Sequence, residues 1–220
     1  MGGGWWRFVQ LRIKNYDKAI VVSTRGEVAE IENAVRAAAE FFVKFDHTTP
    51  VPIRNLYATP ETLGYDRLAA AVGAHDMIAT GALGRVEAAL VVDFGTAITY
   101  DVVTAAGEFL GGNISPGVAS RFRAMHEHTG ALPMGALPEA APEFPARETK
   151  TAIGSGVAWG IAAETERYIL EAEEKFGTVG VIFTGGDADY FARRVKFPIF
   201  AVSELVFRGL NAILEHNANL

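Results

Sequence analysis

The residues with the clearest chemical potential lie in the stretch VVDFGTAITYDVV, residues 91–103. Two β-rich runs flank a tight Gly-Thr-Ala turn, and the carboxylate of Asp93 comes just before it. A plain hairpin would prefer Asn-Gly or Asp-Gly at the bend. Gly95 has no Cβ, so its backbone can approach an anion closely, and Thr96 adds a hydroxyl and an N–H group. The stretch therefore favours a phosphate-binding hairpin over an ordinary polar bend, with Asp93 placed to hold a cation.

Two further glycine-rich turns each follow an expected strand and precede an expected helix. The first, GGNISPG at 111–117, would let a ligand lie against the backbone and a helix N-terminus. The second, TGGDA at 184–188, follows a buried strand, and open α/β sheets bind ligands at the carboxyl ends of their strands. Its paired glycines, Gly185 and Gly186, would admit an adenine or ribose face. Taken alone, each turn is equally well explained as a simple strand-to-helix connection.

A fourth motif is Gly-Tyr-Asp-Arg at 64–67, at the expected start of a helix. A carboxylate in the first helical turn is stabilised in its ionised form, so Asp66 is able to cap the helix. It is equally able to accept a proton from a substrate hydroxyl, as kinases of several folds require. The guanidinium of Arg67 offers a clamp for a carboxylate or a phosphate.

The composition limits the classes of protein to which the chain can belong. Its 220 residues are 50% apolar, enough for one large domain or two small ones. A net charge of −6 without a dominant basic stretch argues against nucleic acid and anionic membranes as partners. The chain has no cysteine, which excludes disulfides and thiolate metal sites. No apolar run reaches the roughly 18 residues of a membrane span. A soluble cytoplasmic protein is therefore expected.

Apolar periodicity and turn residues predict the elements of the first part of the chain. They are a strand at 19–23, an amphipathic helix built on Val28, Ile31, Val35, Ala39 and Phe42, a short helix starting at Thr59-Pro60-Glu61, and a helix at 66–78. Gly81 and Gly84 then mark a loop, and a domain boundary is expected there or slightly after it.

The second part of the chain is expected to begin with an antiparallel meander. The predicted elements are strands at 88–94, 98–103 and 108–114, a helix from 117 toward 128, a loop at 132–145, a helix at 151–175, a strand at 179–183, a helix at 188–195, a strand at 198–202 and a helix at 204–216. An antiparallel meander excludes a purely doubly wound sheet. The order of elements instead resembles a ribonuclease-H-like half within an α/β fold.

Together, and in this order, the four motifs resemble the type III pantothenate kinases of the actin/Hsp70/sugar-kinase superfamily. The similar stretches are RNLYATPETLGYDRLAAAVGA (54–74), DFGTAITYDVV, GEFLGGNISPG, ETKTAIGSG (148–156) and IFTGGDA. The resemblance runs from about Lys18 to the C-terminal helix. It implies duplicated ribonuclease-H-like (actin-like ATPase) domains with mixed sheets at 1–86 and 87–202, and a helix at 203–220 that packs back toward the first domain.

The resemblance also implies an activity, which is transfer of the ATP γ-phosphate to the primary hydroxyl of pantothenate in the first step toward coenzyme A. Asp66 matches the catalytic base of the family. The implied substrate-binding residues are Tyr57, Gly64, Tyr65, Asp66, Arg67 and Thr149. Thr149 matches a threonine that reaches pantothenate across a dimer interface, so a homodimer is expected.

On the nucleotide side, the resemblance implies ATP with magnesium and a monovalent cation, potassium or ammonium. Asp93 matches the aspartate that binds the monovalent cation. Thr96 matches a threonine that contacts ATP. Gly95, Gly185 and Gly186 complete the ATP-binding residues expected from the motifs.

One stretch departs from the family pattern. The family begins with a strand that ends in Asp-x-Gly-Asn-Thr, the first phosphate loop, whereas MGGGWWRFVQLRIKNY stands in its place here. A truncated first domain is therefore expected. Three interpretations stay open: an active kinase whose chain lacks its true start, a non-catalytic binding or regulatory relative that cannot hold ATP, and a kinase of the same superfamily that acts on a different small hydroxyl compound.

Overall fold

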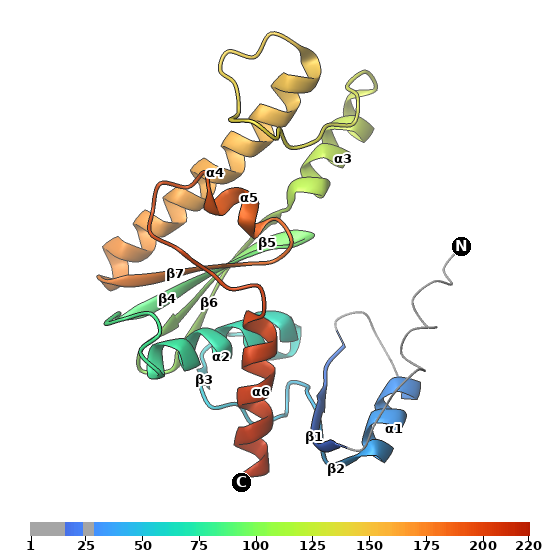
Figure 1. Ribbon diagram of the computed structural model, residues 1–220, viewed down its shortest axis with the longest axis vertical. Helices are drawn as coiled ribbons and strands as arrows, with labels where there is room; N and C mark the ends of the chain where they lie inside the picture. Colours follow the sequence, from blue (N-terminus) through green and yellow to red (C-terminus); the bar gives the residue numbers. More distant parts are fainter. Residues whose placement is uncertain (1–15, 24–28) are drawn as a thin grey trace.

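The computed structural model describes residues 16–23 and 29–220, and the strands in these ranges form two sheets (Figure 1). The smaller sheet is a parallel pair, β1 (Tyr16–Val21) and β2 (Ala39–Lys44), with the helix α1 (Ala29–Ala38) between them in the chain. The predicted strand at 19–23 is confirmed, but it starts three residues earlier and ends two residues earlier. Residues 1–15, where the expected truncation falls, lie outside the described residues.

The predicted helix from Val28 to Phe42 is wrong at its C-terminal end. The helix ends at Ala38, and residues 39–44 (AEFFVK) form β2 instead. Aromatic residues and valine favour a strand, and Phe42 pairs with Ala19 of β1. A short apolar run is compatible with either conformation, so pairing with a strand remote in the sequence decides between them. Val28 itself lies outside the described residues.

The larger sheet has six strands in the order β3-β6-β5-β4-β7-β8. Its elements and the helices around it are β3 (Arg54–Asn55), the 3₁₀ helix η2 (Pro60–Thr62), α2 (Tyr65–Ala79), β4 (Ala88–Phe94), β5 (Ala97–Thr104), β6 (Glu108–Pro116), α3 (Val118–Thr129), α4 (Thr149–Phe176), β7 (Val179–Thr184), α5 (Ala188–Ala192), β8 (Phe200–Ala201) and α6 (Leu205–Ala218).

The connectivity of this sheet confirms the predicted mixed α/β fold with a ribonuclease-H-like half. β4, β5 and β6 form the antiparallel meander, and β7 pairs in parallel with β4 and with β8. The predicted helices are present, but α5 ends three residues before the expected 195 and β8 is shorter than the expected 198–202. Within the described ranges, no helix is long and apolar enough to cross a membrane.

The central strand β4 separates two apolar cores. Ala89 and Val91 pack with α2 and α6, whereas Leu90 and Val92 pack with α3, α4 and α5. This alternation follows from the two-residue period of a strand. In Figure 1 the sheet accordingly lies between α3, α4 and α5 above and α2 and α6 below. Both faces of β4 are covered, which accounts for its run of apolar residues.

The helices α2 and α6 pack so closely that glycine is required at their crossing. A Cβ at Gly209 of α6 would lie 1.8 Å from the carbonyl oxygen of Ala69, and a Cβ at Gly73 of α2 would lie 2.4 Å from that of Leu205. The C-terminal helix therefore lies directly against the helix that carries Asp66. β3 also pairs with β6, across the expected boundary near residue 86. The division into domains at 1–86, 87–202 and 203–220 stays a prediction.

Gly209→Ala should destabilise the protein because a new Cβ would collide with the backbone of α2. We expect the free energy of unfolding to fall by about 1–3 kcal/mol, the usual cost of overpacking. Gly156 of α4 is the matched control, since a Cβ there meets nothing within 4 Å. Gly156→Ala should raise the stability by up to about 1 kcal/mol, because alanine favours a helix. Urea denaturation of both variants measures the contrast, and equal effects would contradict the close packing.

Candidate active site

Two of the predicted turns meet at the carboxylate of Asp93. Asp93 lies near the end of β4, opposite Thr184 of β7. The next residue of β7's turn, Gly185, has φ +90°, and a Cβ there would lie 2.4 Å from Asp93 Oδ1. A Cβ at Gly95, in the turn after β4, would lie 3.6 Å from the same oxygen. The structure thus brings DFGT and TGGDA together around one carboxylate.

The third turn, GGNISPG, packs against the turn that joins β4 to β5. The N–H of Gly117 donates a hydrogen bond to the carbonyl oxygen of Thr96 at 3.1 Å, and the Ser120 hydroxyl donates to that oxygen at 3.0 Å. A Cβ at Gly117 would lie 2.2 Å from the carbonyl oxygen of Gly95. The three glycine-rich turns therefore touch through their backbones, while the side chain of Thr96 remains exposed.

Asp93 is partly buried, and its surroundings destabilise the ionised form of its carboxyl group. Burial, together with the smaller effect of the charges of Asp66 and Asp101, raises the pKa of its carboxyl group to about 6. No described residue donates a hydrogen bond to this carboxylate. A bound cation would relieve that cost, so the site suits a cation. Within residues 16–23 and 29–220, no group of three or more histidine or acidic side chains could hold a metal ion. A cation at Asp93 would thus draw its other ligands from backbone, water or substrate.

Asp66 lies at the N-terminus of α2 with its carboxylate exposed. Its Oδ1 accepts a hydrogen bond from the backbone N–H of Arg67 at 2.9 Å. A Cβ at Gly64 would lie 2.5 Å from that same oxygen, so a larger residue there would displace the carboxylate from this position. Asp66 also lines a cavity of about 530 Å³, together with Lys44 of β2 and other residues of the first part of the chain. The carboxylate is thus both a partial helix cap and accessible to a ligand.

Arg67 is largely occupied by a partner within the chain. Its Nε and Nη2 atoms donate to the carboxylate of Asp101 on β5, at 3.0 and 2.5 Å, and both side chains are buried. Burial lowers the pKa of Arg67. The hydrogen bonds and the charge of Asp101 raise it by more, so the net shift is upward. Its guanidinium also lies 5.3 Å from the ring centre of Tyr57. The Arg67 side chain is therefore 7% exposed and has little surface left for a ligand.

Sequence reasoning missed Asp101, although a signal for it exists. An aspartate inside the otherwise apolar run ITYDVV must be paired if the strand is buried, because aspartate is almost never fully buried alone. Burial raises the pKa of Asp101, and the Arg67 hydrogen bonds oppose that rise. The pair joins the strand that follows the phosphate turn to the helix that carries Asp66.

Tyr57 and Tyr65 lie beside these groups, and Thr149 does not. The ring of Tyr57 faces Gly111, where φ is +86° and a Cβ would lie 2.7 Å from the ring. Tyr65 packs against Phe45. Thr149 is the first residue of α4 and is exposed. In Figure 1 that end of α4 lies on the opposite side of the sheet from α2, so one chain does not bring Thr149 to Asp66.

Comparison with known proteins agrees with this arrangement of turns. The sequence model of the type III pantothenate kinases matches residues 3–171. The chain belongs to the type III pantothenate kinase family. A type III pantothenate kinase of Porphyromonas gingivalis is 46% identical over 206 residues, which cover 92% of this chain and 81% of that protein. One of Bacteroides fragilis is 45% identical over 172 residues, covering 78% and 68%.

Among solved structures, one described as a Baf family transcriptional activator from Campylobacter jejuni has a TM-score of 0.62. It covers 97% of this chain and 88% of its own, at 24% identity, and therefore shows likeness of fold alone. The resemblance of the motifs to the pantothenate kinases is thus confirmed by whole-sequence comparison. As a member of a kinase family, the chain is a phosphotransferase for which ATP is the expected phosphate donor.

The raised pKa of Asp93 predicts that the stability of the protein depends on pH. Because the folded-state pKa lies above the ordinary value, the folded state binds more protons between about pH 4 and 6. Stability is therefore lost as the pH rises through that window, by up to about 3 kcal/mol for a shift of about two units. Asp93→Asn removes this loss, so the variant should exceed the wild type in stability at pH 7.5 and approach it at pH 4.

Urea denaturation across this pH range measures the difference, in choline chloride so that no potassium binds. Asp46→Asn is the control of opposite sign. The hydrogen bond from the Thr48 hydroxyl lowers the pKa of Asp46, so that carboxylate stabilises the fold at neutral pH. Loss of stability at pH 7.5 in both variants would contradict the prediction for Asp93.

Proposed function

We propose that the protein transfers the γ-phosphate of ATP to the primary hydroxyl of pantothenate, the first step toward coenzyme A. The observation that carries this proposal is electrostatic. The charge of Asp66 contributes to the raised pKa of Asp93, so this exposed carboxylate lies within electrostatic range of the cluster of glycine turns. Membership in the type III pantothenate kinase family supports the choice of substrate.

In the proposed reaction, Asp66 accepts the proton of the pantothenate hydroxyl as that oxygen attacks the γ-phosphorus. The new O–P bond forms while the bond from the γ-phosphorus to the β,γ-bridging oxygen breaks, and ADP leaves with that electron pair. The carboxylate of Asp66 is exposed in the first turn of α2, so a substrate hydroxyl can reach it. Its orientation follows from the hydrogen bond to the Arg67 backbone.

The nucleotide is proposed to lie over the three turns, where Thr96, Gly185 and Gly186 would offer N–H groups to its phosphates and Gly95 would allow close approach to the backbone. We propose that Asp93 holds a potassium or ammonium ion, since its carboxylate is partly buried and lacks a hydrogen-bond donor. Magnesium bound with ATP would neutralise phosphate charge during transfer.

Pantothenate is proposed to bind beside Asp66, against Tyr57, Gly64, Tyr65 and Arg67. Thr149 would reach it from a second copy of the chain, because α4 presents this residue far from α2 of its own protomer. A homodimer with sites at its interface, located in the cytoplasm, completes the proposal.

Calorimetry and an activity assay test the proposal directly. Absence of ATP binding together with binding of pantothenate would favour the non-catalytic relative. Turnover of another hydroxyl compound alone would favour a kinase of the same superfamily with a different substrate.

Asp66→Asn should abolish pantothenate phosphorylation while the fold survives. An amide cannot accept the proton, and loss of a general base typically costs 10²- to 10⁴-fold in rate, so we expect roughly a 100-fold fall or more in kcat. Asp76→Asn is the control on the same helix; it loses an ion pair with Arg208 but should keep its activity. Coupled ADP release measures both variants, and turnover like the wild type in Asp66→Asn would remove this residue from the role of base.

Potassium or ammonium should activate the enzyme through Asp93. We expect a higher rate in potassium chloride than in sodium chloride at equal ionic strength, because a larger monovalent ion loses its hydration shell at lower cost. Asp93→Asn should lower the rate and remove the preference. Equal wild-type rates in the two salts would contradict a monovalent-cation role for Asp93.

A further inference from the structure

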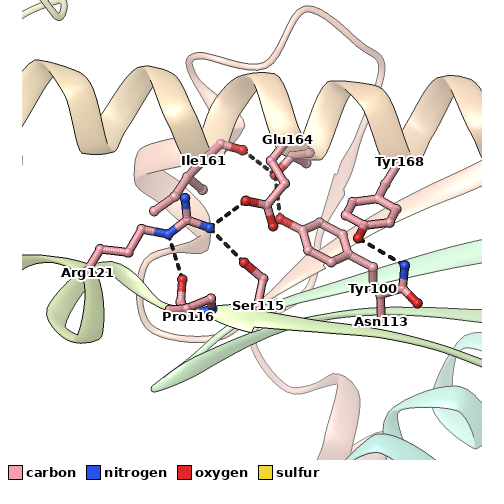
Figure 2. Close-up of polar contacts among 9 residues, drawn as sticks. Tyr100, Asn113, Ser115, Pro116, Arg121, Ile161, Glu164 and Tyr168 are labelled. Atoms are coloured by element: carbon pink, nitrogen blue, oxygen red, sulfur yellow. Dashed lines mark hydrogen bonds and ion pairs between the residues drawn. The ribbon is translucent and has the colours of Figure 1, made fainter. Parts of the chain in front are cut away.

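Arg121 of α3 joins three elements in a cluster that the motifs leave unexplained (Figure 2). Its Nε donates to the carbonyl oxygen of Pro116 at 2.8 Å, and its Nη2 donates to the Ser115 hydroxyl at 2.7 Å. The same Nη2 donates to the carboxylate of Glu164 on α4 at 2.5 Å. The two charged side chains are only 22% and 27% exposed. One guanidinium thus connects the end of β6 to α3 and α4.

The carbonyl that Arg121 holds is one residue from the phosphate-side turns. Pro116 precedes Gly117, whose N–H donates to the carbonyl oxygen of Thr96. The backbone N–H of Arg121 donates in turn to the carbonyl oxygen of Gly117 at 3.0 Å. A continuous series of hydrogen bonds therefore runs from Glu164 through Arg121 and this corner to the turn at Thr96.

The same turn of α4 also holds the other strand of the hairpin. Thr165, next to Glu164, lies 3.2 Å from the hydroxyl of Tyr100 on β5, and that contact is buried. Tyr100 stacks on Tyr168, with ring centres 4.0 Å apart, and the Tyr168 hydroxyl accepts a hydrogen bond from Asn113 of β6. In Figure 2 these groups form one polar layer between α4 and the two strands.

The chemistry of this layer favours arginine for a specific reason. A planar guanidinium presents fixed donors and can satisfy a carbonyl, a hydroxyl and a carboxylate at once. A lysine ammonium at the same position keeps the charge but lacks this fixed planar arrangement of donors. A partly buried pair of opposite charges adds little stability over an apolar pair, so its value lies in the geometry that it imposes.

We propose that Arg121, held by Glu164, is a positioning residue for ATP. It fixes the Pro116-Gly117 corner, and through it the turn at Thr96, in the shape that receives phosphate. This inference rests on the proposed function, in which that turn contacts the nucleotide. We expect the loss to fall mainly on ATP, because Arg121 lies on the opposite face of the sheet from α2 and contacts α4 at Glu164, 15 residues from Thr149.

The test uses the full chain with Arg121→Gln, Arg121→Lys, Glu164→Gln and the double variant Arg121→Gln/Glu164→Gln. Calorimetry gives the Kd for magnesium-ATP, steady-state kinetics give the KM for each substrate, and urea denaturation gives stability. Arg208→Gln is the matched control, since it removes an ion pair of similar length between α6 and α2. We expect Arg121→Gln to raise both Kd and KM for ATP on the order of 10-fold with little change in the KM for pantothenate.

The remaining variants test whether Arg121 and Glu164 act together on ATP binding. Glu164→Gln should have a smaller effect of the same kind, Arg121→Lys should recover part of the ATP affinity, and the double variant should be no worse than Arg121→Gln, because the two groups act in series. Arg208→Gln should lower stability without changing the ATP parameters.

Two outcomes would overturn the proposal. ATP parameters that stay within about twofold of the wild type in Arg121→Gln, with only stability reduced, would make the pair a structural contact. Equal losses for ATP and pantothenate would do the same. If the wild type binds ATP but does not phosphorylate pantothenate, the proposed function fails while the comparison of Kd values still decides this inference. A wild type that binds no ATP would reject both.

Discussion

The buried ion pair between Arg67 and Asp101 is the interaction on which the geometry of the site depends. It joins α2, whose first turn carries Asp66, to β5, the strand that leaves the phosphate turn. Both charges are removed from water, so neither can be tolerated without the other, and loss of one partner from such a pair typically costs 3–5 kcal/mol. The pair therefore fixes the distance between the start of α2, with Asp66, and the glycine turn that joins β4 to β5.

The sheet around this pair acts as a rigid frame because its central strand is buried on both faces. Alternate residues of β4 enter two separate cores, so the end of the strand, and Asp93 with it, has little freedom to move. Glycine at 95, 117 and 185 then allows three turns to touch through their backbones. The cost of this arrangement is electrostatic, since Asp93 is held in a place that raises its pKa. Retaining a destabilised carboxylate at the meeting point of the turns is typical of functional sites.

Local patterns predicted much of the fold, and the one clear error has a physical cause. The meander, the helices after it and the turn residues follow from short-range signals such as alternation, glycine at bends and proline at helix starts. These signals gave the wrong structure for the segment 39–44. Its apolar residues fit a helix or a strand, and only its pairing with β1 selects the strand. The relation of Thr149 to the site is a different case, since the role proposed for it requires a second copy of the chain.

The sequence by itself determined the chemistry available to this protein: glycine turns suited to phosphate, a carboxylate at a helix start, and family membership through the order of these motifs. Only the tertiary structure decided how they are combined. Asp101 lies 34 residues from its partner Arg67, and Glu164 lies 43 residues from Arg121. No local propensity encodes such contacts. They exist because folding of the sheet and packing of α2 and α4 on its two faces bring remote polar groups into places where water cannot satisfy them.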